Sequence, residues 1–440
     1  MMILLGIITA IFIFTVIVMI HEWGHFKAAR IFGVKVEEFG LGIPPRAKKL
    51  FVDKKGTLFS LNWLPLGGFV KLAGEVPKSF LIYDENKKKL RNEQIEKYIL
   101  EKKDLFDKNL EKISENDKKE ILKIINENKA DYNLTNKSAW KQSIIILAGV
   151  FMNFLLAFFI FFFLFLFGVK PIGINDKIQT NLEIKLIPTL DQAIKNGILE
   201  KQNGVKISPL NGSLAHKSGL NKNDIILEIN NEKITSTKHF LEMIKENTAK
   251  EINIKRICET ECVNELKIKI GQDGKLGTYV GENIIFNENF KYKYGFLDSV
   301  KYAFLETKNQ VLMTFKGIGL LAQKIFAPKD KKERAEAIES MAGPIGIVDF
   351  ITKTLSAGII FLIIIGAIIS INLGVFNLLP IPALDGGRFL FIVINSVFKK
   401  IFGKNFLGEN METIIHFTFF VILIALSLII AYNDINKIIG

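Results

Sequence analysis

Cysteine and histidine are scarce in this chain, which holds two cysteines and five histidines among 440 residues. Neither Cys258 nor Cys262 has around it the further ligand residues that a metal site needs. A disulfide between the two and a pair of free thiols both remain open, because a sequence gives no geometry for the pair. The search for metal-binding chemistry therefore turns to histidines and carboxylates.

Charge is absent from four long stretches, at 1–20, 142–169, 354–384 and 413–433. Each can cross the hydrocarbon core of a bilayer, which takes roughly 20 helical residues. Buried helices of soluble proteins seldom run so far without a charge, so the pattern argues against an ordinary soluble fold. We predict a polytopic α-helical membrane protein with four transmembrane helices, at 1–30, 142–169, 354–384 and 413–433.

The first stretch has no positive charge before it and no A-x-A-like site after it, so we expect a retained anchor and not a cleaved signal peptide. Basic residues beside the spans set the orientation, because cytoplasmic flanks are enriched in Lys and Arg. They follow the first span, precede the second and lie between the third and fourth: Lys27, Arg30, Lys35, Lys137, Lys141, Arg388, Lys399, Lys400 and Lys404. These segments should be cytoplasmic, and the segment between the second and third spans should lie outside.

The net charge of +13 is not accompanied by a nucleic-acid-binding motif. We therefore expect no nucleic-acid partner and interpret the lysines as faces near the anionic surface of a lipid bilayer.

Turn residues, charge and periodicity predict further regions between the spans. The first is a membrane-associated β-hairpin region at 31–76, with strands near 34–39, 57–63 and 68–72 and with turns at Gly40, Gly42, Pro44, Pro45, Gly67 and Gly68. A charged helical cytoplasmic insert at 77–140 follows it. The others are an outer region at 172–290 that contains a small folded domain, an amphipathic helix and linker at 294–340, and a cytoplasmic loop at 385–411.

The motif His21-Glu22-Trp23-Gly24-His25 ends the first apolar stretch. One helical turn separates the two histidines, so both imidazoles project from one face, with Glu22 about 100° further round the axis. Two imidazoles suit Zn²⁺, and a nearby carboxylate can accept a proton from an activated water. The alternative is a structural pair of core histidines, but ionisable groups inside a membrane are costly and usually functional.

A catalytic zinc normally takes three protein ligands. His216 and His239 lie in the segment expected outside, and nothing around His416 has ligand character. Asp385 stands just after the third stretch, where it can meet His25 at a similar depth. A solvated turn residue is the alternative interpretation of Asp385.

The third stretch is broken near its end by Pro380 and Pro382, and Gly386 and Gly387 add flexibility. Non-helical backbone at membrane depth survives only where protein or water satisfies its polar groups. The break therefore predicts a water-filled cavity beside Asp385.

The HEWGH motif of the first span and the NLLPIPALDGG sequence at 377–387 together resemble the site-2 protease family of M50-type intramembrane zinc metalloproteases. The bacterial regulator-of-sigma-E protease branch is the most similar part of that family. Further matches lie at 66–71, 148–154 and 342–347, in the same order along the chain.

The resemblance implies roles for individual residues. His21, His25 and Asp385 would be zinc ligands, and Glu22 the catalytic acid and base. Asn372 and Asn377 would help to hold substrate or the developing oxyanion. The hairpin strand that would align the substrate includes Gly67, Gly68, Phe69 and Val70.

Residues 205–207, 211–220 and 224–230 look like the permuted PDZ domains of this branch, which are periplasmic. We place the domain at about 200–275 and its peptide groove at Val205, Lys206 and Ile207, because PDZ grooves add a peptide strand to a sheet edge. A second PDZ domain cannot be traced.

The sequence thus predicts a zinc metalloendopeptidase of a bacterial inner membrane, with its active site toward the cytoplasm. The implied substrates are single-span membrane proteins, such as an anti-sigma factor or remnant signal peptides. Two alternatives are a PDZ-bearing membrane scaffold with a structural histidine pair, and an ion-coupled transporter. A scaffold would hold no stoichiometric zinc that His21→Ala removes, and a transporter would show paired repeats, which the sequence lacks.

Overall fold

The computed structural model describes residues 2–75, 82–83, 89–90, 130–175, 180–258, 263–404, 406–407 and 409–439. The chain divides into two compact units. The first combines Met1–Phe167 with Tyr294–Gly440, and the second is Gly168–Lys293. Most of the predicted insert at 77–140 lies outside the described residues, which include there the short strands β3 (Ile82–Tyr83) and β4 (Lys89–Leu90).

Four described helices of the first unit are long and apolar enough to cross a membrane. They are α1 (Met2–Ile31), α5 (Ala139–Phe167), α12 (Ile359–Leu378) and α14 (Glu409–Ile439). Each overlaps one charge-free stretch of the sequence, so the prediction of four helices that are long and apolar enough to cross a membrane is confirmed. Large apolar side chains such as Phe12, Phe151 and Phe417 are exposed on them, as expected of helices that face lipid.

The third membrane helix is shorter than its charge-free stretch. A separate helix, α11 (Pro344–Thr354), ends where that stretch begins. α12 ends at Leu378, because Pro380 and Pro382 lack the N–H groups that would continue its hydrogen bonds. The helix therefore breaks where the sequence predicted a break.

The predicted cytoplasmic loop at 385–411 was wrong, because it begins with an 18-residue helix, α13 (Asp385–Phe402). The sequence contains an end signal that the prediction overlooked, since Gly403 follows the helix with a left-handed φ of 73°. Gly386 and Gly387 are buried in the first turn, where a Cβ would lie 2.2–2.3 Å from backbone oxygens at the end of α12 and in the loop that follows it. The two positions are glycine because the backbone of residues 378–381 passes too close for a side chain, and not because this segment needs flexibility.

The β-hairpin region is a two-stranded sheet, formed by β1 (Val36–Val52) and β2 (Leu58–Leu72), that folds back on itself. Residues 38–41 lie between 58–61 and 68–71 and pair with both. Gly40, Gly42, Pro44 and Pro45, predicted as turns, lie within β1, between the part that pairs with residues 68–71 of β2 and the part that pairs with 58–62. Gly67 and Gly68, also predicted as turns, lie within β2. Residues 68–71 thus form an edge that pairs with no further strand in the described part of the chain.

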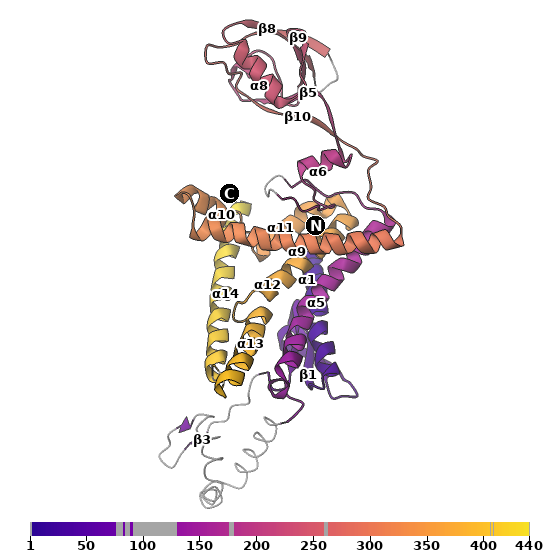
Figure 1. Ribbon diagram of the computed structural model, residues 1–440, viewed down its shortest axis with the longest axis vertical. Coiled ribbons are helices and arrows are strands. Elements are labelled where there is room, and N and C mark those ends of the chain that lie inside the picture. The colour runs from indigo at the N-terminus through magenta and orange to yellow at the C-terminus, as the bar shows by residue number, and fades with distance from the viewer. Residues whose placement is uncertain are drawn as a thin grey trace, which may run out of the picture. The chain divides into compact units, whose positions relative to one another are not determined.

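The predicted amphipathic helix and linker at 294–340 consist of α9 (Phe296–Phe326) and α10 (Lys331–Glu339). α9 crosses α5 and α12 near one end of the bundle (Figure 1). Its buried side is largely polar, and its exposed side carries large apolar residues together with lysines, which favours a helix lying along a membrane surface over a core-facing one. The buried residues include Ser299, Glu306, Thr307 and Gln310, and the exposed ones Phe296, Leu297, Phe304 and Phe326.

The second unit contains a six-stranded sheet with the order β10-β5-β6-β8-β9, in which β7 pairs with β6. Its elements are α6 (Leu190–Lys195), β5 (Leu199–Pro209), α7 (Leu214–Lys217), β6 (Ile225–Ile229), β7 (Glu232–Lys233), α8 (Thr237–Glu246), β8 (Glu251–Ile257), β9 (Val263–Lys269) and β10 (Thr278–Phe286). The core lies between the sheet and α8. Cys258 is disulfide-bonded, and Cys262 lies outside the described residues.

Candidate metal centre

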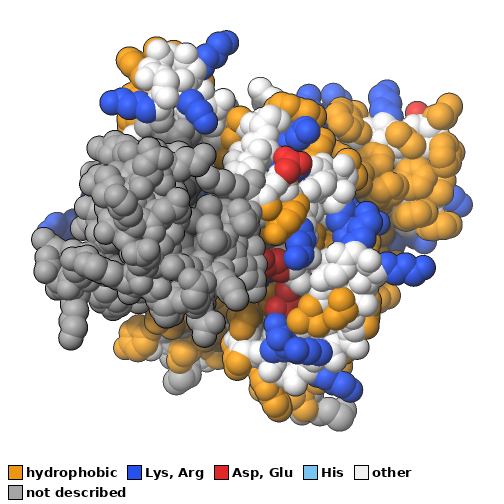
Figure 2. Space-filling model, turned by 90° about the horizontal axis from the view of Figure 1, so that it is seen from below, with side chains coloured by type: hydrophobic (Ala, Val, Ile, Leu, Met, Phe, Trp, Pro, Cys, Tyr) orange, Lys and Arg blue, Asp and Glu red, His pale blue; other side chains and the backbone are white. Residues whose placement is uncertain are grey.

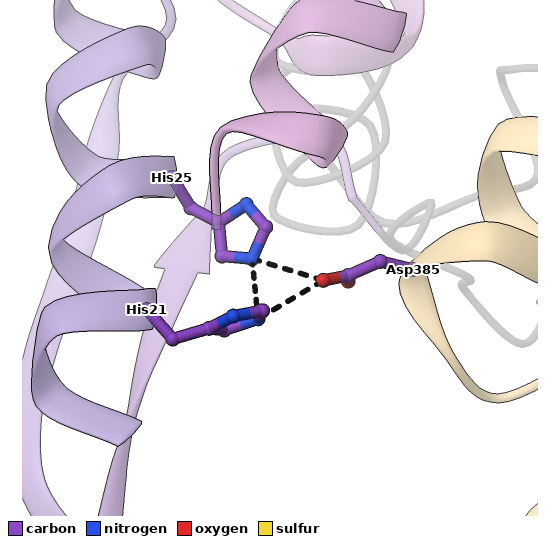
Figure 3. A group of neighbouring side chains, drawn as sticks. All are labelled: His21, His25 and Asp385. Atoms are coloured by element: carbon purple, nitrogen blue, oxygen red, sulfur yellow. Dashed lines mark hydrogen bonds and ion pairs between the residues drawn. The ribbon is translucent and has the colours of Figure 1, made fainter. Parts of the chain in front are cut away.

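His21, His25 and Asp385 meet at one point of the first unit (Figure 3). α1 presents the two histidines one turn apart on a buried face, and the first residue of α13 is Asp385. Oδ2 of Asp385 lies 3.0 Å from Nε2 of His21 and 3.3 Å from Nε2 of His25. The two Nε2 atoms are 3.1 Å apart. The structure thus joins the three residues that the sequence singled out as metal ligands.

The tautomer of His25 follows from its hydrogen bond. Nδ1 of His25 lies 2.8 Å from the carbonyl oxygen of Ile145 on α5. A carbonyl oxygen only accepts, so Nδ1 carries the proton and Nε2 presents its lone pair to Asp385 and His21. This arrangement is the one that a histidine metal ligand needs.

The second histidine is held by Asn153, which is fully buried on α5. The amide nitrogen of Asn153 lies 3.2 Å from Nδ1 of His21, while the amide oxygen has no partner among the described residues. Amide orientations are assigned from the hydrogen-bond network. With the amide turned over, its oxygen accepts the Nδ1 proton of His21, and Nε2 then presents a lone pair as in His25.

The three donor atoms fit a zinc ion by chemistry and by size. Ligand bonds of about 2.0–2.1 Å in a tetrahedral site hold donor atoms about 3.3–3.4 Å apart, close to the observed separations of 3.0–3.3 Å. Oδ2 of Asp385 is buried and has no hydrogen-bond partner in the described chain, although both Nε2 atoms lie within ion-pair distance. A cation would satisfy all three atoms at once.

Gly149 on α5 provides the space for this cluster. A Cβ at Gly149 would lie 2.4 Å from Nε2 of His25 and 2.7 Å from Cε1 of His21, so no larger residue fits. Gly149 and Asn153 are one helical turn apart and share a face. No role for either residue was predicted from the sequence, although their i, i+4 spacing within an apolar span was the available signal.

Glu22 is fixed by the edge of the β-hairpin region. The backbone N–H of Val70 donates a 3.0 Å hydrogen bond to Oε2 of Glu22. Glu22 lines a cavity of about 320 Å³ together with His21, His25 and Asp385. Phe69 and Val70 line the same cavity, so the edge strand forms one of its walls.

Gly67 and Gly68 do not line this cavity. A Cβ on Gly67 would lie 3.0 Å from Val18, and one on Gly68 would lie 2.5 Å from the sulfur of Met19. The two glycines therefore let β2 approach α1 closely, which sets the position of Phe69 and Val70.

The two predicted asparagines lie in different places. Nδ2 of Asn377 is 3.4 Å from Nε2 of His21, and Asn377 lines the cavity. Asn372 does not line it, because its Oδ1 accepts a 2.8 Å hydrogen bond from the hydroxyl of Thr314 on α9. The sequence could not show this difference, since both residues belong to the same short motif.

An ion pair between Glu75 and Arg388 closes one side of the cavity. It connects the turn that follows β2 with the first turn of α13. Burial disfavours the charge of Arg388, but the neighbouring Glu75 carboxylate outweighs burial and raises the pKa of Arg388 above its ordinary value. The ion pair thus ties α13, the helix that begins with Asp385, to the segment that follows β2.

The predicted peptide groove at Val205, Lys206 and Ile207 was wrong. These residues lie in β5, which pairs with β10 on one side and with β6 on the other. No strand can be added to a backbone that is already paired on both edges. A groove of about 530 Å³ lies instead between α8 and the edge strand β10.

Comparisons with known proteins agree with this geometry. The model of peptidase family M50 matches residues 9–426. The zinc metalloprotease RasP of Bacillus licheniformis is 30% identical, over 98% of this chain and 99% of the relative. The regulator of sigma-W protease RasP of Bacillus subtilis is 28% identical over 98% of each chain, and the zinc metalloprotease RasP of Oceanobacillus iheyensis is 27% identical over 98% and 99%. The family resemblance read from the motifs is confirmed, and the chain belongs to peptidase family M50 and is a zinc metalloprotease.

Proposed function

We propose that this protein is an intramembrane protease that cuts peptide bonds in or near transmembrane segments, with His21, His25 and Asp385 as its zinc ligands. The observation that carries the proposal is the meeting of these three side chains beside Glu22, in a cavity walled by apolar helices. Ionisable groups in such surroundings are costly and are kept for function.

Zinc bound there would act as a Lewis acid toward a substrate carbonyl, and it would lower the pKa of a water so that this water can lose a proton and attack at neutral pH. Glu22 accepts the proton of the attacking water and returns it to the leaving amine. The N–H of Val70 holds Oε2 of Glu22, so the carboxylate stays turned into the cavity. Asn377, beside His21, can donate its amide hydrogens to a developing oxyanion.

A transmembrane helix hides its carbonyl groups in its own hydrogen bonds, so a substrate must unwind before cleavage. The edge at 68–71 lies at the cavity and pairs with no further strand in the described part of the chain. An unwound segment could pair with this edge and stay extended. Phe69 and Val70 would then align the substrate, and Gly67 and Gly68 would position them.

The orientation that we propose places the active site toward the cytoplasm of a bacterial inner membrane. Lys and Arg side chains are common, and acidic ones few, on the face of the molecule seen in Figure 2. This is the end of the first unit at which β1 lies and α13 ends (Figure 1), and it carries the exposed residues Lys48, Lys49, Lys399, Lys400 and Lys404. Positive flanks of this kind are retained on the cytoplasmic side.

We propose that the second unit is an extracytoplasmic PDZ-like domain that binds extended peptides. Its support is the groove between α8 and the edge strand β10, where a peptide can add a strand and place side chains against α8. The described residues 168–198 carry one short helix, α6, which supports a single such domain. The substrates we propose are single-span membrane proteins, such as an anti-sigma factor, or remnant signal peptides.

The test compares membrane proteomes of cells that produce the native chain, Glu22→Gln or Glu336→Gln. Glu336 is an exposed glutamate on α10 and serves as the matched control. Membrane-embedded fragments should accumulate with Glu22→Gln and should be cleared by the other two proteins. Purified Asp385→Ala should hold no stoichiometric zinc. The proposal is wrong if no fragment changes, or if Asp385→Ala keeps its zinc.

A further inference from the structure

The loop between α12 and α13 contains a turn that its sequence disfavours. The N–H of Leu384 donates a 3.1 Å hydrogen bond to the carbonyl of Ile381, which closes a four-residue turn. Pro382 occupies the second position and Ala383 the third, with a φ of 81°. A positive φ at the third position is typical of a type II turn, where glycine is the usual residue. Ala383 therefore needs external support to stay in this conformation.

His416 on α14 gives that support. Nδ1 of His416 lies 2.8 Å from the backbone nitrogen of Ala383. A backbone N–H only donates, so Nδ1 accepts and the ring proton is on Nε2. Type I and type II turns differ by the direction of their central peptide. A hydrogen bond to the Ala383 N–H therefore selects the peptide direction that Ala383 alone would avoid.

The ring of His416 also contacts the helix that follows the turn. Its centroid lies 5.3 Å from that of Phe391 on α13, in an edge-to-face arrangement. Its Nε2 atom is buried and lies 3.9 Å from a carboxylate oxygen of Glu412. One side chain thus holds both the turn before Asp385 and the helix that begins with it.

We propose that His416 is a positioning residue for the metal centre, acting through the Pro382–Ala383 peptide on Asp385. The inference rests on the proposed role of Asp385 as a ligand. Asp385 follows Ala383 by two residues, and the turn directs its carboxylate toward His21 and His25. His416 lies outside the donor cluster formed by the two histidines and Asp385.

The experiment uses the full chain in detergent and four substitutions. His416→Asn keeps an acceptor near the position of Nδ1, whereas His416→Gln places its amide near the position of Nε2. His416→Ala removes both. His216→Ala, at an exposed histidine of the second unit, is the matched control. The measurements are the rate of zinc loss to a chelator and the visible absorption spectrum of the Co²⁺-substituted protein, with peptide cleavage measured alongside.

His416→Ala should lose zinc about tenfold faster or more, the usual effect of removing a group that orients a metal ligand, and its Co²⁺ spectrum should change. His416→Asn should recover most of the zinc retention, and His416→Gln should not. His216→Ala should match the native protein. Equal behaviour of His416→Asn and His416→Gln, or native zinc retention in His416→Ala, would overturn the proposal.

A double variant separates support of the turn from any other role of His416. Ala383→Gly removes the cost of the positive φ, so the turn can form without a hydrogen bond from outside. Adding Ala383→Gly to His416→Ala should therefore slow zinc loss relative to His416→Ala alone. If zinc loss is unchanged, His416 does not act through the turn. Stoichiometric zinc in Asp385→Ala would instead refute the proposed function, whatever the His416 variants show.

Discussion

The N–H of Val70 donates a 3.0 Å hydrogen bond to the carboxylate of Glu22, which joins the edge of the β-hairpin region to the helix that carries the histidines. Val70 lines the cavity, so the strand proposed to align the substrate also orients the proposed acid and base. A substrate that binds along this strand would therefore be placed relative to Glu22 by a single hydrogen bond. This coupling makes the length of the Glu22 side chain critical.

We predict that Glu22→Asp lowers the rate of cleavage about 100-fold, because losing one methylene withdraws the carboxylate by about 1 Å or more from its position. The zinc content should stay at the native level, since none of the three donor residues changes. Cleavage of a membrane-embedded reporter and metal analysis of the purified protein measure the two quantities. Glu336→Asp, at an exposed glutamate of α10, is the matched control and should cleave normally. Native activity in Glu22→Asp would contradict the role proposed for Glu22.

Gly149→Ala should disturb the metal centre without changing any donor residue. The new Cβ would lie 2.4 Å from Nε2 of His25, so either the histidine or α5 must move. We expect zinc affinity to fall about tenfold or more, by analogy with the loss of other groups that orient metal ligands. Gly317→Ala on α9 is the control, because a Cβ there meets nothing within 4 Å. Equal zinc affinity in the two variants would show that Gly149 is not part of the centre.

The meeting of His21, His25 and Asp385 could be predicted from the sequence because its physical causes are local. Two histidines one turn apart must share a helix face, and two prolines must end α12. The cost of a charged group at membrane depth then made Asp385 the natural third partner. The contacts of Val70, Asn153 and His416 were not predictable in this way, since each joins segments that only the fold brings together.

The predictions that failed have equally specific causes. The groove was placed on β5 because a peptide strand was expected there, but edge position depends on sheet order, which no local pattern shows. The segment of α13 was predicted to be a loop because Gly386 and Gly387 were interpreted as flexible. They are instead glycines in a helix, because the backbone of residues 378–381 leaves no space for a side chain. Asn372 and Asn377 diverge because they lie five positions apart on α12 and thus face different neighbours.

A buried aspartate connects α14 with the start of α11. Asp434 is 2% exposed, and its Oδ2 accepts hydrogen bonds of 2.9 Å and 2.8 Å from the N–H groups of Gly343 and Gly346. Asp434→Ala should destabilise the first unit by about 1–3 kcal/mol, because two donors at the helix start lose their acceptor. A lower thermal denaturation temperature in detergent would report it. Asp349→Ala, which breaks an i, i+4 pair with Lys353, should change that temperature little. A similar temperature for both variants would contradict the capping role.

Glu282 should make the stability of the second unit depend on pH. It lies on β10 and accepts a 3.2 Å hydrogen bond from the N–H of Thr237 at the start of α8, while its other oxygen lies 2.9 Å from Nζ of Lys201. Burial would raise the pKa of Glu282, but the hydrogen bonds from Lys201 and Thr237 outweigh burial and hold the pKa below the usual 4.5. The charged form is thus favoured by folding.

Because the folded pKa is depressed, the stabilisation from Glu282 is present above pH 4.5 and is lost as the pH falls through the folded pKa. Hydrogen exchange of the full chain should show α8 well protected near neutral pH and less protected in acid, after correction for intrinsic exchange rates. In Glu282→Gln the protection should already be lower at neutral pH and should change less in acid. Glu242→Gln, in an exposed pair with Lys238 on α8, should keep the native pH dependence. If Glu282→Gln also keeps it, the carboxylate does not stabilise the groove between α8 and β10.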